Sequence, residues 1–165
     1  MTALVSGRQT AHYDEDFVVF LIGMRVNRWW RPDLWMPVAG AMPRMMKELE
    51  GRTDLGFLGA ESGFGNPSIQ VMYWTSAEAL VDYARSRDHH HLPAWVDFKR
   101  RVQATNAVGV WHETYRIAPG MHESVYVNMP AFGLGKVGQL VPATGARTRA
   151  TERLRVRSAH AAPEE

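Results

Sequence analysis

The distribution of apolar side chains along the chain predicts strands and helices in a definite order. Residues 17–27 are β-rich and apolar at nearly every position, which is typical of a central strand covered on both faces. Residues 35–49 have apolar side chains at helical spacing, and Pro43 is expected to kink or restart this helix. Shorter β-like patterns at 55–64 and 68–74, separated by a Gly-Asn-Pro turn, predict a hairpin.

The second half of the chain predicts a further helix followed by two strands. Residues 75–78 have the sequence of a capping box and open a helix, which is interrupted near residues 89–91 and resumes after Pro93. Strands are expected at 107–117 and, more briefly, at 124–129. The order β-α-β-β-α-β is that of the α+β, ferredoxin-like fold, an antiparallel sheet with two helices on one face. Because the other face is left apolar, we expect two copies to pair through it as a homodimer.

The composition changes from one end of the chain to the other. We expect a flexible leader at 1–15, one ferredoxin-like α+β barrel domain with a Gly-rich C-terminal arm at 16–141, and a disordered tail at 142–165. The tail is basic, and a solvated tail is the preferred interpretation over contact with nucleic acid, so no nucleic-acid partner is expected. Its basic residues are Arg147, Arg149, Arg153, Arg155 and Arg157.

The composition of the chain excludes several classes of protein chemistry and of cellular location. The 165 residues are enough to bury a core, and the absence of cysteine excludes disulfides and thiolate chemistry. The first residues do not resemble a signal peptide, and the longest apolar run, 17–24, is too short to cross a bilayer. These features predict a cytoplasmic protein without a membrane partner. Six Trp and nine Met suit either an apolar cavity or a packed interior.

Residues 111–115 carry the strongest candidate chemistry, Trp-His-Glu-Thr-Tyr on a predicted strand. Alternation would place His112 on one face and Trp111, Glu113 and Tyr115 on the other. Facing a pocket, His112 with Glu113 is a candidate general base near neutral pH. The alternative is a structural histidine bonded to a neighbouring strand or to a glutamate across a dimer.

Two polar residues end the first strand. Arg25 and Asn27 share a face and are candidates to orient or stabilise a substrate anion. Arg25 would serve equally well in a structural ion pair with Glu61 or Glu113.

Large apolar side chains are candidates to line a substrate cavity, although core packing would also explain most of them. They are Trp30, Met72, Trp74, Trp95, Trp111 and Tyr115.

Two further motifs are rejected. His89, His90 and His91 cannot converge on one ion from a regular helix, because successive helical residues point about 100° apart, so no metal site is expected. Residues 133–138 match G-x-G-x-x-G, but no βαβ unit follows to hold a dinucleotide.

Parts of the sequence resemble the dimeric α+β barrels of the antibiotic-biosynthesis-monooxygenase type. The similarity lies in residues 71–80, 83–84, 91–95 and 111–115. Residues 17–27, 29–32, 128–130 and 132–135 are similar to a narrower family of that superfamily, described as monooxygenase-like by analogy with an enzyme of the fungal fumagillin pathway.

The resemblance implies a homodimeric, monooxygenase-like oxidoreductase that acts on an apolar, planar organic substrate. Because the superfamily includes cofactor-free oxygenases, haem enzymes and non-catalytic relatives, we expect no cofactor, with haem as the alternative. His91 or His112 would then be the haem ligand. A non-catalytic small-molecule-binding dimer is the other alternative.

Overall fold

The computed structural model describes residues 3–86 and 91–154, apart from the side chains of residues 91, 92 and 101. The contacts divide the chain into two compact units. The larger unit runs from Phe17 to Arg116, and the smaller one combines the residues before Phe17 with those from Ile117 on.

The strands are β1 (Val5–His12), β2 (Phe17–Val26), β3 (Phe57–Gly63), β4 (Ile69–Trp74), β5 (Val108–Ile117), β6 (Tyr126–Met129) and β7 (Gln139–Pro142). The helices are α1 (Pro32–Ala39), α2 (Ala41–Leu49), α3 (Ala77–Arg85), α4 (His91–Arg101), α5 (Leu134–Val137) and α6 (Ala150–Arg153), with 3₁₀ turns η1 (Thr53–Leu55), η2 (Gln103–Thr105) and η3 (Gly145–Arg147).

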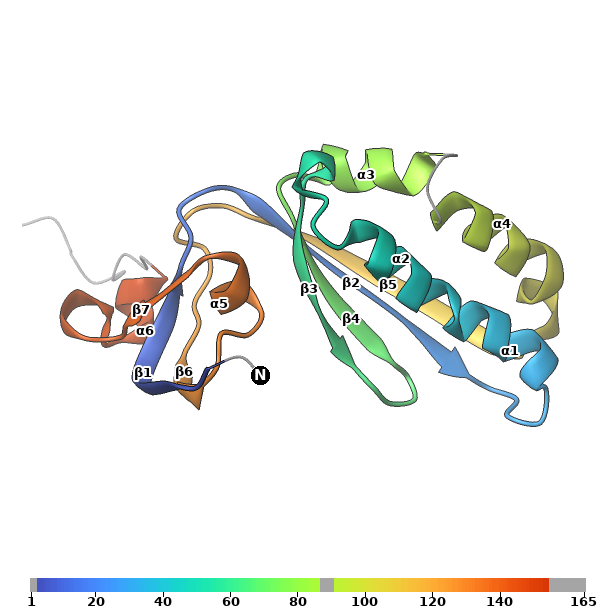
Figure 1. Ribbon diagram of the computed structural model, residues 1–165, viewed down its shortest axis with the longest axis horizontal. Helices are drawn as coiled ribbons and strands as arrows, with labels where there is room; N and C mark the ends of the chain where they lie inside the picture. Colours follow the sequence, from blue (N-terminus) through green and yellow to red (C-terminus); the bar gives the residue numbers. More distant parts are fainter. Residues whose placement is uncertain (1–2, 87–90, 155–165) are drawn as a thin grey trace, which may run out of the picture. The chain divides into compact units, whose positions relative to one another are not determined.

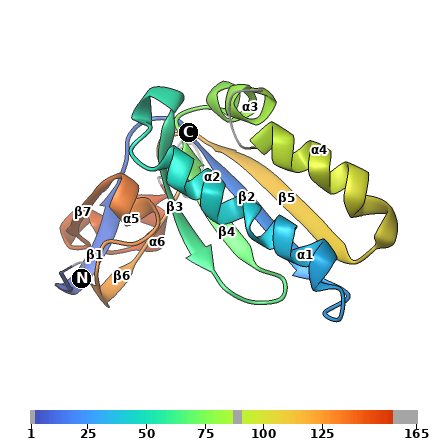
Figure 2. The ribbon, with the colours of Figure 1, turned by 45° about the vertical axis from the view of Figure 1, so that its right-hand side comes forward.

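The larger unit is a four-stranded sheet with helices on one face. The strand order is β3-β4-β2-β5, and β4 is antiparallel to both of its neighbours. Figure 1 shows α1, α2 and α4 lying along one face of this sheet, and Figure 2 shows the same side after a turn of the view. The predicted α+β, ferredoxin-like fold is confirmed in this unit.

Alternation along the strands builds the main core. Val18 lies opposite Trp74 and Phe20 opposite Met72, so these side chains share the face that the helices cover. The Trp74 ring packs edge-on against Phe57, with ring centroids 5.3 Å apart, and is fully buried. A second, smaller core cluster consists of Phe98, Val102 and Val108, with Met24, Trp35 and Val38 packed against it.

The helix predicted over residues 35–49 is two helices, and the break lies at Gly40 rather than at Pro43. The Gly40 N–H ends α1 by donating to the Met36 carbonyl at 2.9 Å. Pro43 lies in the first turn of α2, where a backbone N–H would have no acceptor within the helix. In a continuous helix the Pro43 ring would clash with the carbonyl four residues earlier, that of Ala39. The helix therefore restarts with Pro43 in its first turn, as predicted.

The smaller unit contains segments from both ends of the chain. Residues 5–12, within the predicted leader, form β1, the central strand of a sheet with the order β6-β1-β7. Thr10 pairs with Val141 and Arg8 with Val127, so both partners of this strand come from the far end of the sequence. The predicted tail begins with η3 and α6, and residues 155–165 lie outside the described part.

The division at residues 15 and 141 stays a prediction, because contacts within one structure do not measure which segments fold independently. No helix in the described part of the chain is long and apolar enough to cross a bilayer.

Candidate functional site

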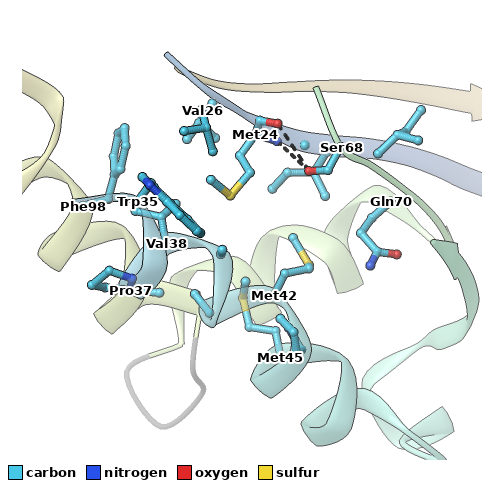
Figure 3. Close-up of a pocket in the computed structure, with 18 of the residues that line it drawn as sticks. Met24, Val26, Trp35, Pro37, Val38, Met42, Met45, Ser68, Gln70 and Phe98 are labelled. Carbon is cyan, nitrogen blue, oxygen red and sulfur yellow. Dashed lines mark hydrogen bonds between the residues drawn. The ribbon is translucent and has the colours of Figure 1, made fainter. Parts of the chain in front are cut away.

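A cavity of about 580 Å³ lies in the larger unit, between the sheet and the helices that cover it (Figure 3). Its wall takes residues from the edges of both core clusters. Ile22 and Met42 belong to the edge of the main core, and Trp35, Val38 and Phe98 belong to the second. The cavity is therefore the space that the two packed clusters leave between them.

The sheet forms the floor of the cavity, and strand alternation determines which of its side chains line it. Ile22, Met24 and Val26 follow each other at every second position of β2, so all three face the helices. Gln70 of β4 pairs with Ile22, and Val110 adds the wall on β5.

Helices α1, α2 and α4 supply the opposite wall. The side chains are large and apolar, and four of them are methionine or tryptophan, which fit irregular ligands well. They are Trp35, Val38, Met42, Met45, Trp95 and Phe98.

Most polar groups of the floor already have partners. The Ser68 hydroxyl accepts from the Met24 N–H at 3.2 Å, and the Ser68 N–H donates to the Met24 carbonyl at 2.8 Å. The Asn66 amide accepts from the Val26 N–H at 2.8 Å and donates to the Val26 carbonyl at 3.1 Å. Through these hydrogen bonds, Asn66 and Ser68 continue the pairing with β2 in the residues just before β4 begins.

Gln70 differs from these residues. Its Oε1 accepts a hydrogen bond from the Ser62 hydroxyl at 2.9 Å, which fixes the orientation of the amide. Its Nε2 has no partner in the part of the chain that the structure describes, and Figure 3 shows the side chain extending from the strand towards α2. The Gln70 amide therefore offers a fixed N–H donor beside an apolar space.

Ionisable groups are scarce on the wall. Among the described lining residues they are Arg44 and Asp97, and Asp97 accepts from Arg100 Nη2 at 3.0 Å. The described lining contains no His, Cys or Tyr, and no cluster of three metal-ligating side chains occurs among the residues that the structure describes. The described walls thus provide no axial haem ligand of these types.

His112 lies on the predicted face of β5, the side that faces the helices, and its ring centroid is 5.6 Å from that of Phe20. Its side chain is exposed and does not contribute to the described wall of the cavity. It comes two residues after Val110, which places it roughly 7 Å farther along the strand.

Trp111, Glu113 and Tyr115 alternate with His112 along β5 and face the other way, as predicted. The Trp111 indole packs against Gly23, where an added Cβ would approach Nε1 to 2.7 Å. That buried Nε1 has no partner among the described residues. Tyr115 donates a hydrogen bond to Glu113 at 2.5 Å, and this carboxylate raises the pKa of the exposed Tyr115 hydroxyl.

Arg25 and Asn27 lie at the end of β2. Asn27 Nδ2 donates to the Asn106 carbonyl at 3.2 Å, a structural link to the turn before β5. Arg25 is exposed, and in the described part of the chain it pairs with neither Glu61 nor Glu113. Neither side chain lines the cavity.

Of the predicted substrate-binding residues, Trp95 alone lines the described cavity. Its ring stacks on Phe98 with centroids 5.4 Å apart, and the Lys99 ammonium lies 5.3 Å from the ring centroid. Met72 and Trp74 are buried in the main core, whereas Trp30 is 74% exposed. His91 is the first residue of α4, but its side chain, like the whole of His89 and His90, lies outside the described residues.

Sequence reasoning missed most of the wall. The helical spacing of residues 35–49 predicted a face with Trp35, Val38, Met42 and either Met45 or Met46, without indicating that the face borders a space. The available signal for Gln70 was a polar side chain on the inward face of an otherwise apolar strand.

Three solved structures that align with the chain have low sequence identity, and the one of these three with a TM-score above 0.5 supports the fold alone. An aldoxime dehydratase (OxdRE) in complex with butyraldoxime aligns with a TM-score of 0.64 and 15% identity, over 81% of this chain and 39% of that one. The chain thus spans about two-fifths of the dehydratase. SnoaB, a cofactor-independent oxygenase from Streptomyces nogalater, aligns with a TM-score of 0.43 and 13% identity over 61% of this chain and 91% of that one. A dimeric protein of unknown function and ferredoxin-like fold from Bacteroides fragilis aligns with a TM-score of 0.45 and 9% identity, over 61% of this chain and 96% of that one.

No curated protein is significantly similar to the chain. The family described as monooxygenase af470-like matches residues 17–134, which include every described residue of the cavity wall. Since this match extends over more than half of the sequence, the chain belongs to the monooxygenase af470-like family.

Proposed function

We propose that this protein is a small oxygenase that binds an apolar, planar organic substrate in the cavity between its sheet and α1, α2 and α4. The observation that carries the proposal is the cavity itself. Its volume of about 580 Å³ lies within the range of roughly 300–1,000 Å³ of small-molecule sites. A mostly apolar wall with one fixed polar donor is typical of a site that binds a flat apolar body and orients one oxygen.

Gln70 is the proposed orienting group. Its Nε2 would donate to a carbonyl or phenol oxygen of the substrate, because Ser62 holds the other end of the amide in place. When substrate deprotonation places negative charge on that oxygen, the same hydrogen bond becomes stronger. Trp35 and Phe98 would lie against the flat body of the substrate.

His112 stays the proposed general base. Its ring lies on the cavity's side of the sheet, one strand repeat beyond Val110, so a substrate longer than the cavity would reach it. The base removes a proton from an activated methylene, and the carbanion passes one electron to dioxygen. Recombination of the two radicals gives a peroxide, which loses water. The methylene becomes a carbonyl: one atom of dioxygen remains in the product, the other leaves as water, and the substrate supplies all the electrons.

This chemistry uses no flavin, nicotinamide or metal, so no cofactor is proposed. The catalytic roles predicted for Arg25, Asn27 and Glu113 stay predictions, because none of these residues lines the described cavity. The haem alternative predicts a Soret band in protein produced with haem supplied.

The test fills the cavity and measures oxygenation. Val38→Phe adds volume to the wall, while Val81→Phe adds the same volume at an exposed position of α3. With anthrone as a planar probe, we expect oxygen uptake and water-forming oxidation by the parent chain, about a tenfold loss in Val38→Phe and no change in Val81→Phe. Melting temperatures of both variants exclude unfolding as the cause. Equal activity of the two variants, with both folded, would contradict the location of the site.

We also propose that two copies pair through the face of the sheet opposite the helices. Leu21 pairs with Val71 and Val19 with Tyr73 on that face, which forms a continuous apolar surface on the two central strands. The homodimer would cover this surface.

A further inference from the structure

The mouth of the cavity carries exposed aromatic side chains on two loops. Trp29 and Trp30 form the turn after β2, and Phe64 follows β3 at the tip of the β3–β4 hairpin. Their exposed fractions are 57%, 74% and 99%. Trp29 and Phe64 also line the cavity, so this surface is its rim.

The two loops lie at the same end of the larger unit in both ribbon views (Figures 1 and 2). The Asn66 side chain accepts a hydrogen bond from the Val26 N–H and donates one to the Val26 carbonyl, which ties the hairpin tip to the end of β2. Trp35 Nε1 donates to the Trp29 carbonyl at 3.2 Å, and the two rings are 5.5 Å apart, edge to face. The exposed aromatics are therefore held on supported backbone.

Around this rim the charge is mainly positive. The segments that form it, residues 25–44, 64–67 and 93–100, contain six basic and two acidic side chains. Both acids are already neutralised locally, Asp33 by Arg31 at 2.6 Å and Asp97 by Arg100 at 3.0 Å. The remaining cations are Arg25, Arg28, Arg44 and Lys99.

We propose that this aromatic rim docks on a lipid bilayer that carries anionic headgroups. Tryptophan prefers the boundary between headgroups and acyl chains, since its ring is apolar and its N–H is polar, and phenylalanine inserts slightly deeper. Surrounding cations are attracted to anionic lipid over about a Debye length. Such a contact is peripheral and needs no membrane-spanning helix.

Docking would open the cavity onto the lipid phase, so that an apolar substrate enters without crossing water. This consequence rests on the proposed function, whereas docking itself does not.

The test uses the full chain, without substrate, and two kinds of vesicle: phosphatidylcholine alone, and phosphatidylcholine with phosphatidylserine. We expect co-sedimentation with the anionic vesicles, with a blue shift of tryptophan emission, and weaker binding at high salt. Trp30→Ser and Phe64→Ser should each lower the partition coefficient about tenfold. Met121→Ser, which removes a 68% exposed apolar side chain in the smaller unit, and Val81→Ser should leave it unchanged.

Two results would overturn the proposal. One is the absence of vesicle binding, or binding that all four variants retain equally. The other is a concentration-dependent self-association that Trp30→Ser abolishes, because the rim would then be covered by a second copy. Absence of anthrone oxidation in a parent chain that still binds vesicles would count against the function and not against the docking.

Discussion

Val110 and His112 lie on the same side of β5, but of the two only Val110 contributes to the described cavity wall. One strand repeat separates them, so the imidazole reaches a bound molecule only if that molecule extends past Val110 towards Phe20. The exposed ring is also free to exchange its proton with water, which a general base must do in each cycle.

Replacing this imidazole separates catalysis from structure. His112→Ala is expected to lower kcat by a factor of about 10²–10⁴, because it removes the proton acceptor. The free energy of unfolding should change by less than about 0.5 kcal/mol, since the ring is exposed. Steady-state oxygen uptake and urea unfolding give the two quantities. A variant that unfolds, or one that keeps full turnover, would show that His112 is not the base.

Gln70 should govern substrate binding. Gln70→Leu keeps the approximate volume but removes the N–H donor, so we expect KM for anthrone to rise about tenfold, equivalent to about 1.4 kcal/mol. Gln103→Leu, on the exposed η2 turn, is the matched control and should behave as the parent chain. Identical KM values for the two variants would remove Gln70 from the site.

Trp74 is expected to act through stability rather than through the substrate. Its ring is fully buried and contacts Phe57 and Tyr83, with the Tyr83 ring centroid at 5.5 Å. Trp74→Ala should therefore lower the free energy of unfolding by about 3–5 kcal/mol. Urea denaturation followed by circular dichroism measures this loss. A nearly unchanged midpoint together with a raised KM would restore Trp74 to the substrate-binding residues.

The Tyr83 hydroxyl should make the free energy of unfolding vary with pH in the alkaline range. Burial, and then its hydrogen bond to Glu48 at 3.0 Å, raises the pKa of the Tyr83 hydroxyl above its usual value near 10. The folded state therefore holds this proton more tightly than the unfolded state does. Its contribution to stability is complete below about pH 10 and is lost as the pH rises towards the folded-state pKa.

Unfolding free energies at pH values above and below 10 test this point. Tyr83→Phe retains the ring and should show a shallower decline above pH 10 than the parent chain does. Parallel declines in the two proteins would mean that another group titrates.

Charge on the open face of the sheet should separate the proposed dimer. Val71→Lys places an ammonium group among Leu21 and its neighbours, where a partner copy would have to desolvate it. We expect a monomer by light scattering, and a dimer for the control Val81→Lys on α3. A parent chain that is itself monomeric would refute this interface.

Local patterns were sufficient for the larger unit. A continuous apolar run identified the strand at 17–27. Alternation along the strand at 107–117 gave the faces of His112 and Trp111, because side-chain direction in a strand depends only on the local backbone. A restart of the helix at Pro43 was predicted, but the position of the break at Gly40 was not, because a proline is compatible with any position in the first turn of a helix.

The sequence alone determined the order of the elements, the α+β fold of the larger unit and which side chains face the helices, since each follows from spacing within a single segment. Tertiary structure decided the rest. β1 exists because Thr10 and its neighbours pair with strands more than a hundred residues away, and no local pattern carries that information. The cavity likewise depends on how far apart two packed clusters come to rest, a distance set jointly by α1, α2, α4 and the sheet.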